Sequence, residues 1–258
     1  MLDAGLVEAL RRSLGGQGRL VHLPADKDVV FVGDTHGDRQ ATERVLARFL
    51  SPQRVVVFLG DYVDRGPDSA GNLQLLLETK LDRPDQLHLL MGNHEGWSVC
   101  PFSPADFWQG LGRREGRAIG ELLSLLPLVA YHPGGVLGLH GALPDVRSVD
   151  EIDSIPLGSA DWRKITWGDW ADVPEYVVDP GALGRPTFGR AYFDDVMARL
   201  SLRALVRSHQ PFAPAYLFSG RCLTIFTSVA YGGTDRRVAL LPAASRVSSA
   251  ADLTVIDL

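Results

Sequence analysis

The chain has 258 residues, of which 45% are hydrophobic and 22% are charged, and its formal net charge at pH 7 is −5. This length and apolar content can supply one sizeable hydrophobic core, so we expect a single domain over residues 1–258. The negative charge gives no basic surface that would make nucleic acid the main partner. The two cysteines, Cys100 and Cys222, are too few for a disulfide scaffold, which favours a reducing, cytoplasmic location.

Residues 1–12 mix charged residues with leucines and lack the basic start and apolar block of a signal peptide. No stretch of the chain approaches the ~20 apolar residues that a membrane-spanning helix needs. We therefore expect no membrane partner, and the composition is compatible with a monomer.

The first half of the chain alternates between strand and helix patterns. Residues 3–14 have the spacing of a short amphipathic helix that ends at Gly15-Gly16. Apolar runs and helical spacing then predict strands at 28–33, 54–59 and 86–91, with helices at 38–50 and 68–82 between them. This order predicts a β-α-β-α-β unit with right-handed crossovers.

The second half is predicted to be richer in strands. Residues 98–126 have mixed helix and loop character, and two strands at 128–132 and 136–140 should form a hairpin around Pro133-Gly134-Gly135. Residues 150–190, rich in Asp, Pro, Gly and Trp, are expected to form a long loop. Further strands are predicted to close a second sheet, at 204–208, 215–218, 222–227 and 237–241.

Three short polar segments follow the three early strands: Gly33-Asp34-Thr35-His36-Gly37, Gly60-Asp61-Tyr62-Val63-Asp64-Arg65-Gly66 and Gly92-Asn93-His94-Glu95. In an open α/β sheet, ligands bind outside the carboxyl ends of the strands. We therefore expect one cleft to contain Asp34, His36, Asp61, Asn93 and His94. Oxygen and imidazole donors without thiolates are typical of a metal site other than structural zinc.

This donor set suits a pair of divalent ions. Two such ions ~3.5–4 Å apart need one ligand shared between them. A carboxylate is the natural bridge because its charge offsets the repulsion between the cations. Carboxylate and imidazole ligands accept Mn, Fe or Zn.

The three segments resemble the phosphoprotein phosphatase (PPP) family of serine/threonine phosphatases, within the wider metallophosphoesterases. That family carries GD-x-HG, GD-x-VDRG and GNHE in this order, followed by an HG, an HQ and a tyrosine. The later counterparts here are His140-Gly141, His209-Gln210 and Tyr231, so the resemblance covers roughly residues 28–240. It implies an α/β fold, a metallophosphoesterase-type two-sheet β-sandwich flanked by helices, with a binuclear metal site at the strand C-terminal ends.

The resemblance also implies a role for each matched residue. Asp34 and His36 would bind the first metal, Asp61 would bridge, and the second metal would be held by Asn93, His140 and His209. His94 would be the general acid for the leaving alkoxide, and Asp64 would orient it. The phosphate would be held by Arg65 and by a second arginine, for which Arg185 is our choice and Arg190 the rival. Tyr231 would face the site from the far side.

The implied reaction is hydrolysis of phosphoserine and phosphothreonine by a metal-bridging hydroxide, without a phospho-enzyme. The cofactors would be two divalent ions, with Mn²⁺ preferred and Fe or Zn as alternatives. Two metals and two arginines would neutralise the charge that develops on the phosphate. Because a serine alkoxide is very basic, a positioned acid should contribute ~10²–10⁴-fold.

Some positions depart from the family pattern: Thr35 replaces a common aliphatic residue, Ala142 a common glycine, and Gly232 a cysteine frequent in eukaryotic members. None removes an implied ligand. They argue against eukaryotic-type regulatory-subunit docking, and with the short chain they favour a compact prokaryotic-type member.

Two other functions use similar features. A diadenosine tetraphosphate hydrolase, or another nucleotide phosphoesterase, has nearly the same metal ligands. A non-catalytic phospho-ligand binder is a remote alternative, since such a protein would typically have lost a ligand or the acid. Trp162, Trp167 and Trp170 by default cover the core, although Trp167 is also a candidate for the rim of the site.

Overall fold

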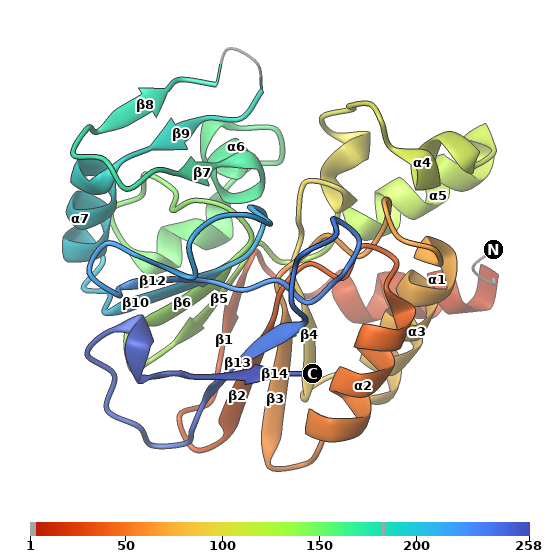
Figure 1. Cartoon of the computed structure of the whole chain (residues 1–258). Helices are drawn as coiled ribbons and strands as arrows, with labels where there is room; N and C mark the ends of the chain where they lie inside the picture. Colours follow the sequence, from red (N-terminus) through yellow and green to blue (C-terminus); the bar gives the residue numbers. More distant parts are fainter. Residues whose placement is uncertain (1–3, 182–183) are drawn as a thin grey trace.

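The computed structural model describes residues 4–181 and 184–258. Two β-sheets pack face to face, with helices flanking them (Figure 1). The two-sheet α/β sandwich expected from the sequence is therefore confirmed. The first sheet has the strand order β14-β13-β2-β3-β4, and the second has the order β1-β5-β6-β10-β12-β11.

The centre of the first sheet is the predicted β-α-β-α-β unit. Strands β2 (Asp28–Val32), β3 (Arg54–Phe58) and β4 (Leu87–Leu89) are parallel, and their connections are helices α2 (Arg39–Phe49) and α3 (Ser69–Asp82). Each helix begins after an aspartate whose side chain accepts a backbone N–H of the first turn, Asp38 for α2 and Asp68 for α3. Such caps stabilise a helix start by about 1 kcal/mol and mark where the chain leaves the site loops.

Strand β13 (Arg237–Leu241) lies antiparallel to β2 in the first sheet, with β14 (Thr254–Asp257) beside it at the edge. The prediction that residues 237–241 join the second sheet is wrong. An alternating apolar pattern indicates a strand but does not say which sheet it joins. Here the open edge of β2 accepts it, with Val238 paired to Val32.

The second sheet contains the predicted hairpin of β5 (Val129–His132) and β6 (Val136–Leu139), which pair in antiparallel register. The other strands of this sheet are β1 (Leu20–His22), β10 (Ala204–Arg207), β11 (Tyr216–Leu217) and β12 (Cys222–Thr224). Strand β1 is absent from the predicted elements because three residues are too few to show a pattern.

The expectation of a long loop over residues 150–190 is wrong. This region contains the 3₁₀-helix η2 (Val149–Ser154), helix α6 (Ala160–Trp167) and a small sheet of β7 (Asp169–Trp170), β9 (Thr187–Phe188) and β8 (Val177–Asp179). Its strands are too short to be recognised from sequence. Tertiary aromatic packing stabilises them: the Trp170 ring lies against Phe193 of helix α7 (Arg190–Arg199) and against Phe218.

The remaining helices are α1 (Ala4–Leu14), η1 (Glu95–Ser98), α4 (Asp106–Gly110), α5 (Arg113–Leu123) and η3 (Ala250–Asp252). The predicted helix at 3–14 is confirmed from Ala4 onward, and Asp3 lies outside the described residues. Within residues 4–181 and 184–258, no helix has the length and apolar character needed to cross a membrane.

Alternate residues of the central strands face two different layers. Val30 and Val56 belong to the apolar cluster that includes Leu73 and Leu76 of α3. Phe31 belongs to the cluster between the two sheets, where Gly138 of β6 sits so close that an added Cβ would lie 2.7 Å from its ring. The sheets also meet through an isolated bridge between Asp34 and Phe226, so their separation is small at the end where the site forms.

Candidate metal centre

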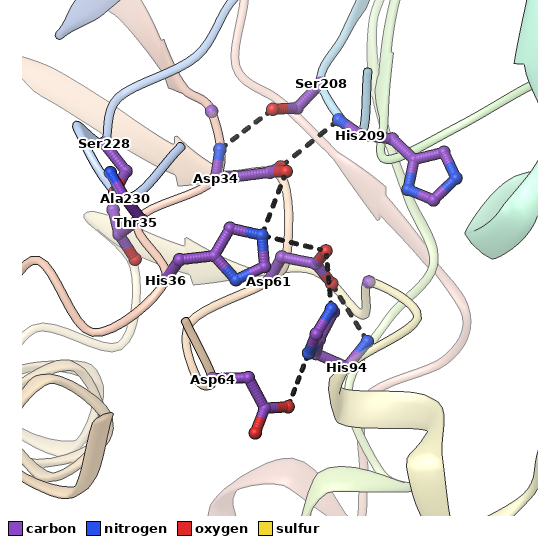
Figure 2. Close-up of polar contacts among 12 residues, drawn as sticks. Asp34, Thr35, His36, Asp61, Asp64, His94, Ser208, His209, Ser228 and Ala230 are labelled. Atoms are coloured by element: carbon purple, nitrogen blue, oxygen red, sulfur yellow. Dashed lines mark hydrogen bonds and ion pairs between the residues drawn. The ribbon is translucent and has the colours of Figure 1, made fainter. Parts of the chain in front are cut away.

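Both sheets deliver polar side chains to one end of the sandwich. The residues that follow strand ends there are Asp34 after β2, Asp61 after β3, Asn93 after β4, His140 after β6 and His209 after β10. All five are buried, with 5% or less of their surface exposed. Figure 2 shows Asp34, His36, Asp61 and His94 pointing toward one another. The structure thus brings together residues that lie up to 175 positions apart.

The loops that carry these side chains adopt unusual backbone conformations. Five non-glycine residues of the site have positive φ: His36 (42°), Asp61 (56°), Asp64 (68°), Arg65 (71°) and His209 (70°). Each such residue costs about 1–3 kcal/mol, and such residues concentrate at functional sites. Cross-loop hydrogen bonds hold this geometry, since the backbone N–H groups of Thr35 and His36 both donate to Asp61 O, at 3.1 and 2.9 Å.

Gly92 permits the close packing of the loops after β3 and β4. A Cβ at this position would lie 2.2 Å from Asp61 Oδ1 and 2.6 Å from Asp61 N. Any side chain would therefore displace Asp61, so the motif glycine is required for steric reasons.

The first ligand group surrounds His36 Nε2. This atom lies 3.6 Å from Asp34 Oδ2 and 3.6 Å from Asp61 Oδ2. His36 Nδ1 donates to Val63 O at 2.9 Å, which leaves Nε2 directed at the two carboxylates. Asp34 Oδ2 is buried and has no hydrogen-bond partner. A buried carboxylate oxygen without a donor is consistent with a cation ligand.

The second ligand group surrounds His140 Nε2. This atom lies 3.3 Å from Asp61 Oδ2, 3.1 Å from Asn93 Oδ1 and 3.0 Å from His209 Nδ1. His140 Nδ1 donates to Leu59 O at 3.0 Å, so Nε2 is again the nitrogen that can bind a metal. Four nitrogen and oxygen donors therefore converge on one point.

Among the residues that the structure describes, two sets of three buried residues have donor atoms within 4.8 Å of one another, and Asp61 belongs to both. The sets are His36, Asp61 and His94, and Asp61, His140 and His209. The first includes His94, whereas the resemblance assigns that place to Asp34. Asp34 nevertheless offers its unpartnered Oδ2 to the same space. The donors fit two divalent ions that share Asp61.

The electrostatics of the site favour an ionised carboxylate at its centre. Burial opposes the charge of Asp61, but His140 and His94 outweigh it and hold the Asp61 pKa well below its usual range. Burial likewise opposes the charge of His36, yet Asp34 and Asp61 raise the pKa of His36 to about 9 in the metal-free site, so a metal ion bound at Nε2 would displace the proton held there. For His209, burial, Arg185 and His140 lower the pKa well below the usual value, so its ring is neutral, as a metal ligand must be.

His94 and Asp64 form a buried pair at the edge of the metal groups. His94 Nδ1 donates to Asp64 Oδ2 at 2.5 Å, and His94 Nε2 faces Asp61 Oδ2 at 3.8 Å. The other Asp64 oxygen accepts the Phe107 backbone N–H at 2.7 Å, and Trp108 Nε1 donates to His94 O at 2.9 Å. The imidazole is thereby held from several sides, with one nitrogen free to serve the reaction.

Glu95 is a site residue to which the sequence analysis assigns no role, although it ends the third motif. Its carboxylate accepts the backbone N–H groups of Asp61 (2.7 Å), Tyr62 (2.9 Å) and Gly92 (3.0 Å). Burial and the charge of Asp61 raise the pKa of Glu95 to about 7. Glu95 therefore ties the loop after β3 to the loop after β4. A short motif reveals candidate metal ligands from their residue types. The backbone groups that a carboxylate such as Glu95 binds become visible only in the folded structure.

Arg65 and Tyr231 lie on the side of the metal centre that is exposed to solvent. The Tyr231 ring is 5.4 Å from the His36 ring, edge-on. Burial, Asp61 and Asp34 raise the pKa of Tyr231 to about 12. Arg65 is exposed and, in the part of the chain that the structure describes, has no carboxylate ion pair. Its guanidinium is thus available for an anion.

The two candidates for the second arginine occupy different places. Arg185 donates two hydrogen bonds of 2.8 Å to Asp169, whose Oδ1 lies 3.6 Å from His209 Nε2. Arg190 instead pairs with Asp172 at 2.7 Å and stacks over the Phe218 ring. Arg185 is therefore linked to the metal ligand His209 through Asp169, whereas Arg190 binds Asp172 next to the small sheet.

The three loop tryptophans differ in how far they are buried. Trp162 and Trp170 are buried, with 1% and 3% of their surface exposed, as the default core interpretation expects. Trp167 is half-buried and lies edge-on to the rings of His209 and Phe102, at 6.3 and 4.9 Å. Its rim role stays a prediction.

Residues 27–212 match the sequence profile of the family described as calcineurin-like phosphoesterase. Among curated proteins, a probable serine/threonine-protein phosphatase of Encephalitozoon cuniculi is 30% identical over 244 residues, covering 85% of this chain and 50% of its own length. The serine/threonine-protein phosphatase 4 catalytic subunit of Eremothecium gossypii is 30% identical over 236 residues, covering 84% of this chain and 73% of its own. The chain thus spans half the length of the first relative.

Among solved structures, a protein serine/threonine phosphatase from Saccharomyces cerevisiae with similarity to human phosphatase PP5 superposes with a TM-score of 0.83. It is 21% identical, and the match covers 99% of this chain and 88% of that one. A putative diadenosine tetraphosphatase matches with a TM-score of 0.55 and 20% identity, over 93% of this chain and 98% of that one. These two likenesses show the fold alone.

The sequence profile covers most of the chain, and the Eremothecium relative is matched over most of its length. The chain therefore belongs to the calcineurin-like phosphoesterase family and, within it, to the serine/threonine phosphoprotein phosphatases.

Proposed function

We propose that this protein is a metal-dependent serine/threonine protein phosphatase that hydrolyses phosphate monoesters directly with water. The observation that carries the proposal is the shared Asp61, which belongs to both buried donor groups while His94 and Asp64 stand beside it. The kinship with serine/threonine phosphatases supports the same conclusion. We also propose a single metallophosphoesterase domain over residues 1–258, with its motif-bearing core at 28–240.

The proposed ligands are Asp34, His36 and Asp61 for one ion, and Asp61, Asn93, His140 and His209 for the other. When bound, two divalent ions would neutralise charge on the phosphate and lower the pKa of a water molecule. We propose Mn²⁺ as the activating ion, because carboxylate, amide and imidazole donors together accept it, as they accept Fe and Zn.

Arg65 and Arg185 would hold the phosphate oxygens. A guanidinium matches a phosphate through two parallel hydrogen bonds, which fixes the orientation of the ester as well as its position. Arg65 has the free guanidinium, whereas Arg185 is positioned by Asp169. Tyr231 would face the same side, with its ring 5.4 Å from that of His36.

His94 would donate a proton from Nε2 to the leaving alkoxide oxygen. Because Nδ1 keeps its proton for Asp64, Nε2 can donate a proton only from the doubly protonated ring, and the donation leaves a neutral ring with its proton on Nδ1. Because the alkoxide of serine or threonine is strongly basic, this donation is expected to matter more for phosphoproteins than for aryl phosphates.

The nucleotide phosphoesterase alternative rests on the same metal ligands, and the likeness to a putative diadenosine tetraphosphatase extends to the fold alone. The curated relatives favour protein substrates. A non-catalytic binder is disfavoured because every implied ligand and His94 are present in the site. We further propose a cytoplasmic location and a compact prokaryotic-type enzyme acting as a monomer.

The test measures phosphate release from a phosphoserine/phosphothreonine peptide and from diadenosine tetraphosphate, with metal-stripped protein and Mn²⁺ added back. Asp61→Asn and His94→Asn are the catalytic variants. Peptide turnover that needs the metal and collapses in both variants is the expected result. Hydrolysis of the dinucleotide alone would identify the protein as a nucleotide phosphoesterase. The absence of activity on both substrates would support the non-catalytic alternative.

A further inference from the structure

Three large apolar side chains stand exposed beside the site. Phe212 is 72% exposed, Val229 48% and Tyr231 36%. Phe212 belongs to the loop that begins at His209, and the other two belong to the loop after β12. Single exposed apolar residues are common, but a cluster at the mouth of a polar site indicates a binding surface.

The cluster is continuous with the metal centre. The Tyr231 ring is 5.4 Å from the His36 ring, and the Phe212 ring is 6.4 Å from the Tyr231 ring, edge-on. The aromatic row therefore ends no more than about 12 Å from a metal ligand. An extended peptide advances about 3.3–3.6 Å per residue, so this distance corresponds to one to four residues of a substrate chain.

A hollow of about 550 Å³ lies on the phosphate side of the site and is lined in part by the loop that carries Tyr231. Its lining includes Gly37, Arg39, Arg65, Asp68, Val229 and Arg236. Val229 is an exposed apolar side chain on the wall of this hollow, which Arg65 also lines. The loop that carries Val229 begins at the site, since Thr227 N donates to Asp34 O at 3.1 Å, and Figure 2 draws Ser228 and Ala230 of this loop on the Thr35 side of Asp34.

The charges of the hollow are already compensated except at Arg65. Arg236 binds both oxygens of Asp38, at 2.8 and 3.0 Å. Arg39 pairs with Glu43 at 2.9 Å and with Asp68 at 3.6 Å. The one cation without a carboxylate partner among the described lining residues is therefore the phosphate arginine, and the wall beyond it offers apolar contact rather than net charge.

We propose that Phe212, beside the Tyr231 ring, forms a subsite for an apolar side chain of the substrate, one to four residues from the phosphorylated serine or threonine. The proposal rests on the proposed protein phosphatase activity and adds the class of substrate. Three side chains cover far less than the ~800 Å² per partner of a stable protein interface. The patch therefore fits one side chain of an extended phosphopeptide, and not a second folded molecule.

The experiment compares phosphothreonine peptides that contain only alanine and glycine with peptides that carry one leucine, placed in turn at each of the four positions on either side of the phosphothreonine. The readout is the ratio of kcat/KM between the leucine and alanine peptides. Partial burial of a leucine side chain should give a ratio of about 10 for at least one position. Phe212→Ala should reduce this ratio to about 1–2, and Phe212→Leu should restore most of it.

Tyr176→Ala is the matched control, because Tyr176 is an exposed aromatic residue (45%) on the distant β8 side. It should keep the wild-type ratio. A wild type without any leucine preference, or a preference that survives Phe212→Ala, would overturn the subsite while leaving the phosphatase activity in place. Failure of the wild type on every peptide, with p-nitrophenyl phosphate still hydrolysed, would instead refute the protein phosphatase activity, and the subsite with it.

Discussion

Asp61 and Phe212 belong to the same proposed site, yet 2% of the surface of Asp61 and 72% of that of Phe212 is exposed. The buried centre is a network in which most polar atoms have a defined partner and five residues hold a strained backbone. The rim includes loop side chains that are exposed to solvent, such as Phe212 and Val229. A network fails as a unit when one member is changed, whereas a rim can vary residue by residue. We therefore expect substitutions at the centre to abolish the chemistry and substitutions at the rim to change the choice of substrate.

The largest effect is expected for Asp61→Asn. The substitution removes the negative charge that both donor groups share, so it should weaken metal binding and reduce turnover by about 10³-fold or more. The measurements are bound metal per protein molecule and hydrolysis of p-nitrophenyl phosphate. Asp145→Asn, at an exposed carboxylate paired with Arg199, should behave like the wild type. Full metal content and activity in Asp61→Asn would contradict the bridging role.

The next effect is expected for His94→Asn, and it should depend on the leaving group. Turnover of a phosphoserine peptide should fall about 10²–10⁴-fold, because the serine alkoxide needs a proton. The fall should be much smaller for p-nitrophenyl phosphate, whose leaving phenolate is a weak base. Asp64→Asn should show the same pattern to a lesser degree, since it acts through His94. Equal losses on both substrates would exclude a general-acid role.

Glu95→Gln should have an intermediate effect. Glutamine can offer one acceptor oxygen, and its amide group would face a backbone N–H of Asp61, Tyr62 or Gly92. We expect activity to fall about 10- to 100-fold and the unfolding free energy to fall by about 1–3 kcal/mol. Denaturant unfolding and peptide turnover measure the two effects. Glu121→Gln, at an exposed carboxylate on α5, should change neither.

The smallest effect on activity is expected at a buried charge far from the centre. Lys80 Nζ donates to Pro84 O and Leu87 O, and burial lowers the pKa of Lys80 from 10.5 to about 8. Between these values the unfolded chain holds more protons, so this group makes the unfolding free energy rise with pH, by at most about 1.4 kcal/mol per pH unit. Lys80→Met should remove that rise and leave turnover unchanged. If the difference in unfolding free energy between the wild type and Lys80→Met were constant from pH 7.5 to 10, this titration of Lys80 would be contradicted.

Much of the first half of the fold could be predicted because its signals are local. Valine-rich runs and helical leucines all lie within windows of five to fifteen residues, and the helices predicted at 38–50 and 68–82 match α2 and α3. The small sheet of β7, β9 and β8 could not be predicted in the same way. Its strands have two or three residues, and their stability comes from Trp170 packing on rings that lie elsewhere in the sequence.

For the site, the sequence by itself determined the residue types and their positions at strand ends, because metal donors and tight turns require particular side chains at particular places. Only the tertiary structure decided that Asp34, His140 and His209 meet, that Arg185 rather than Arg190 faces them, and that Glu95 ties two loops together. Convergence depends on how two sheets pack and on where long loops return. These are sums of many weak contacts that no short motif contains.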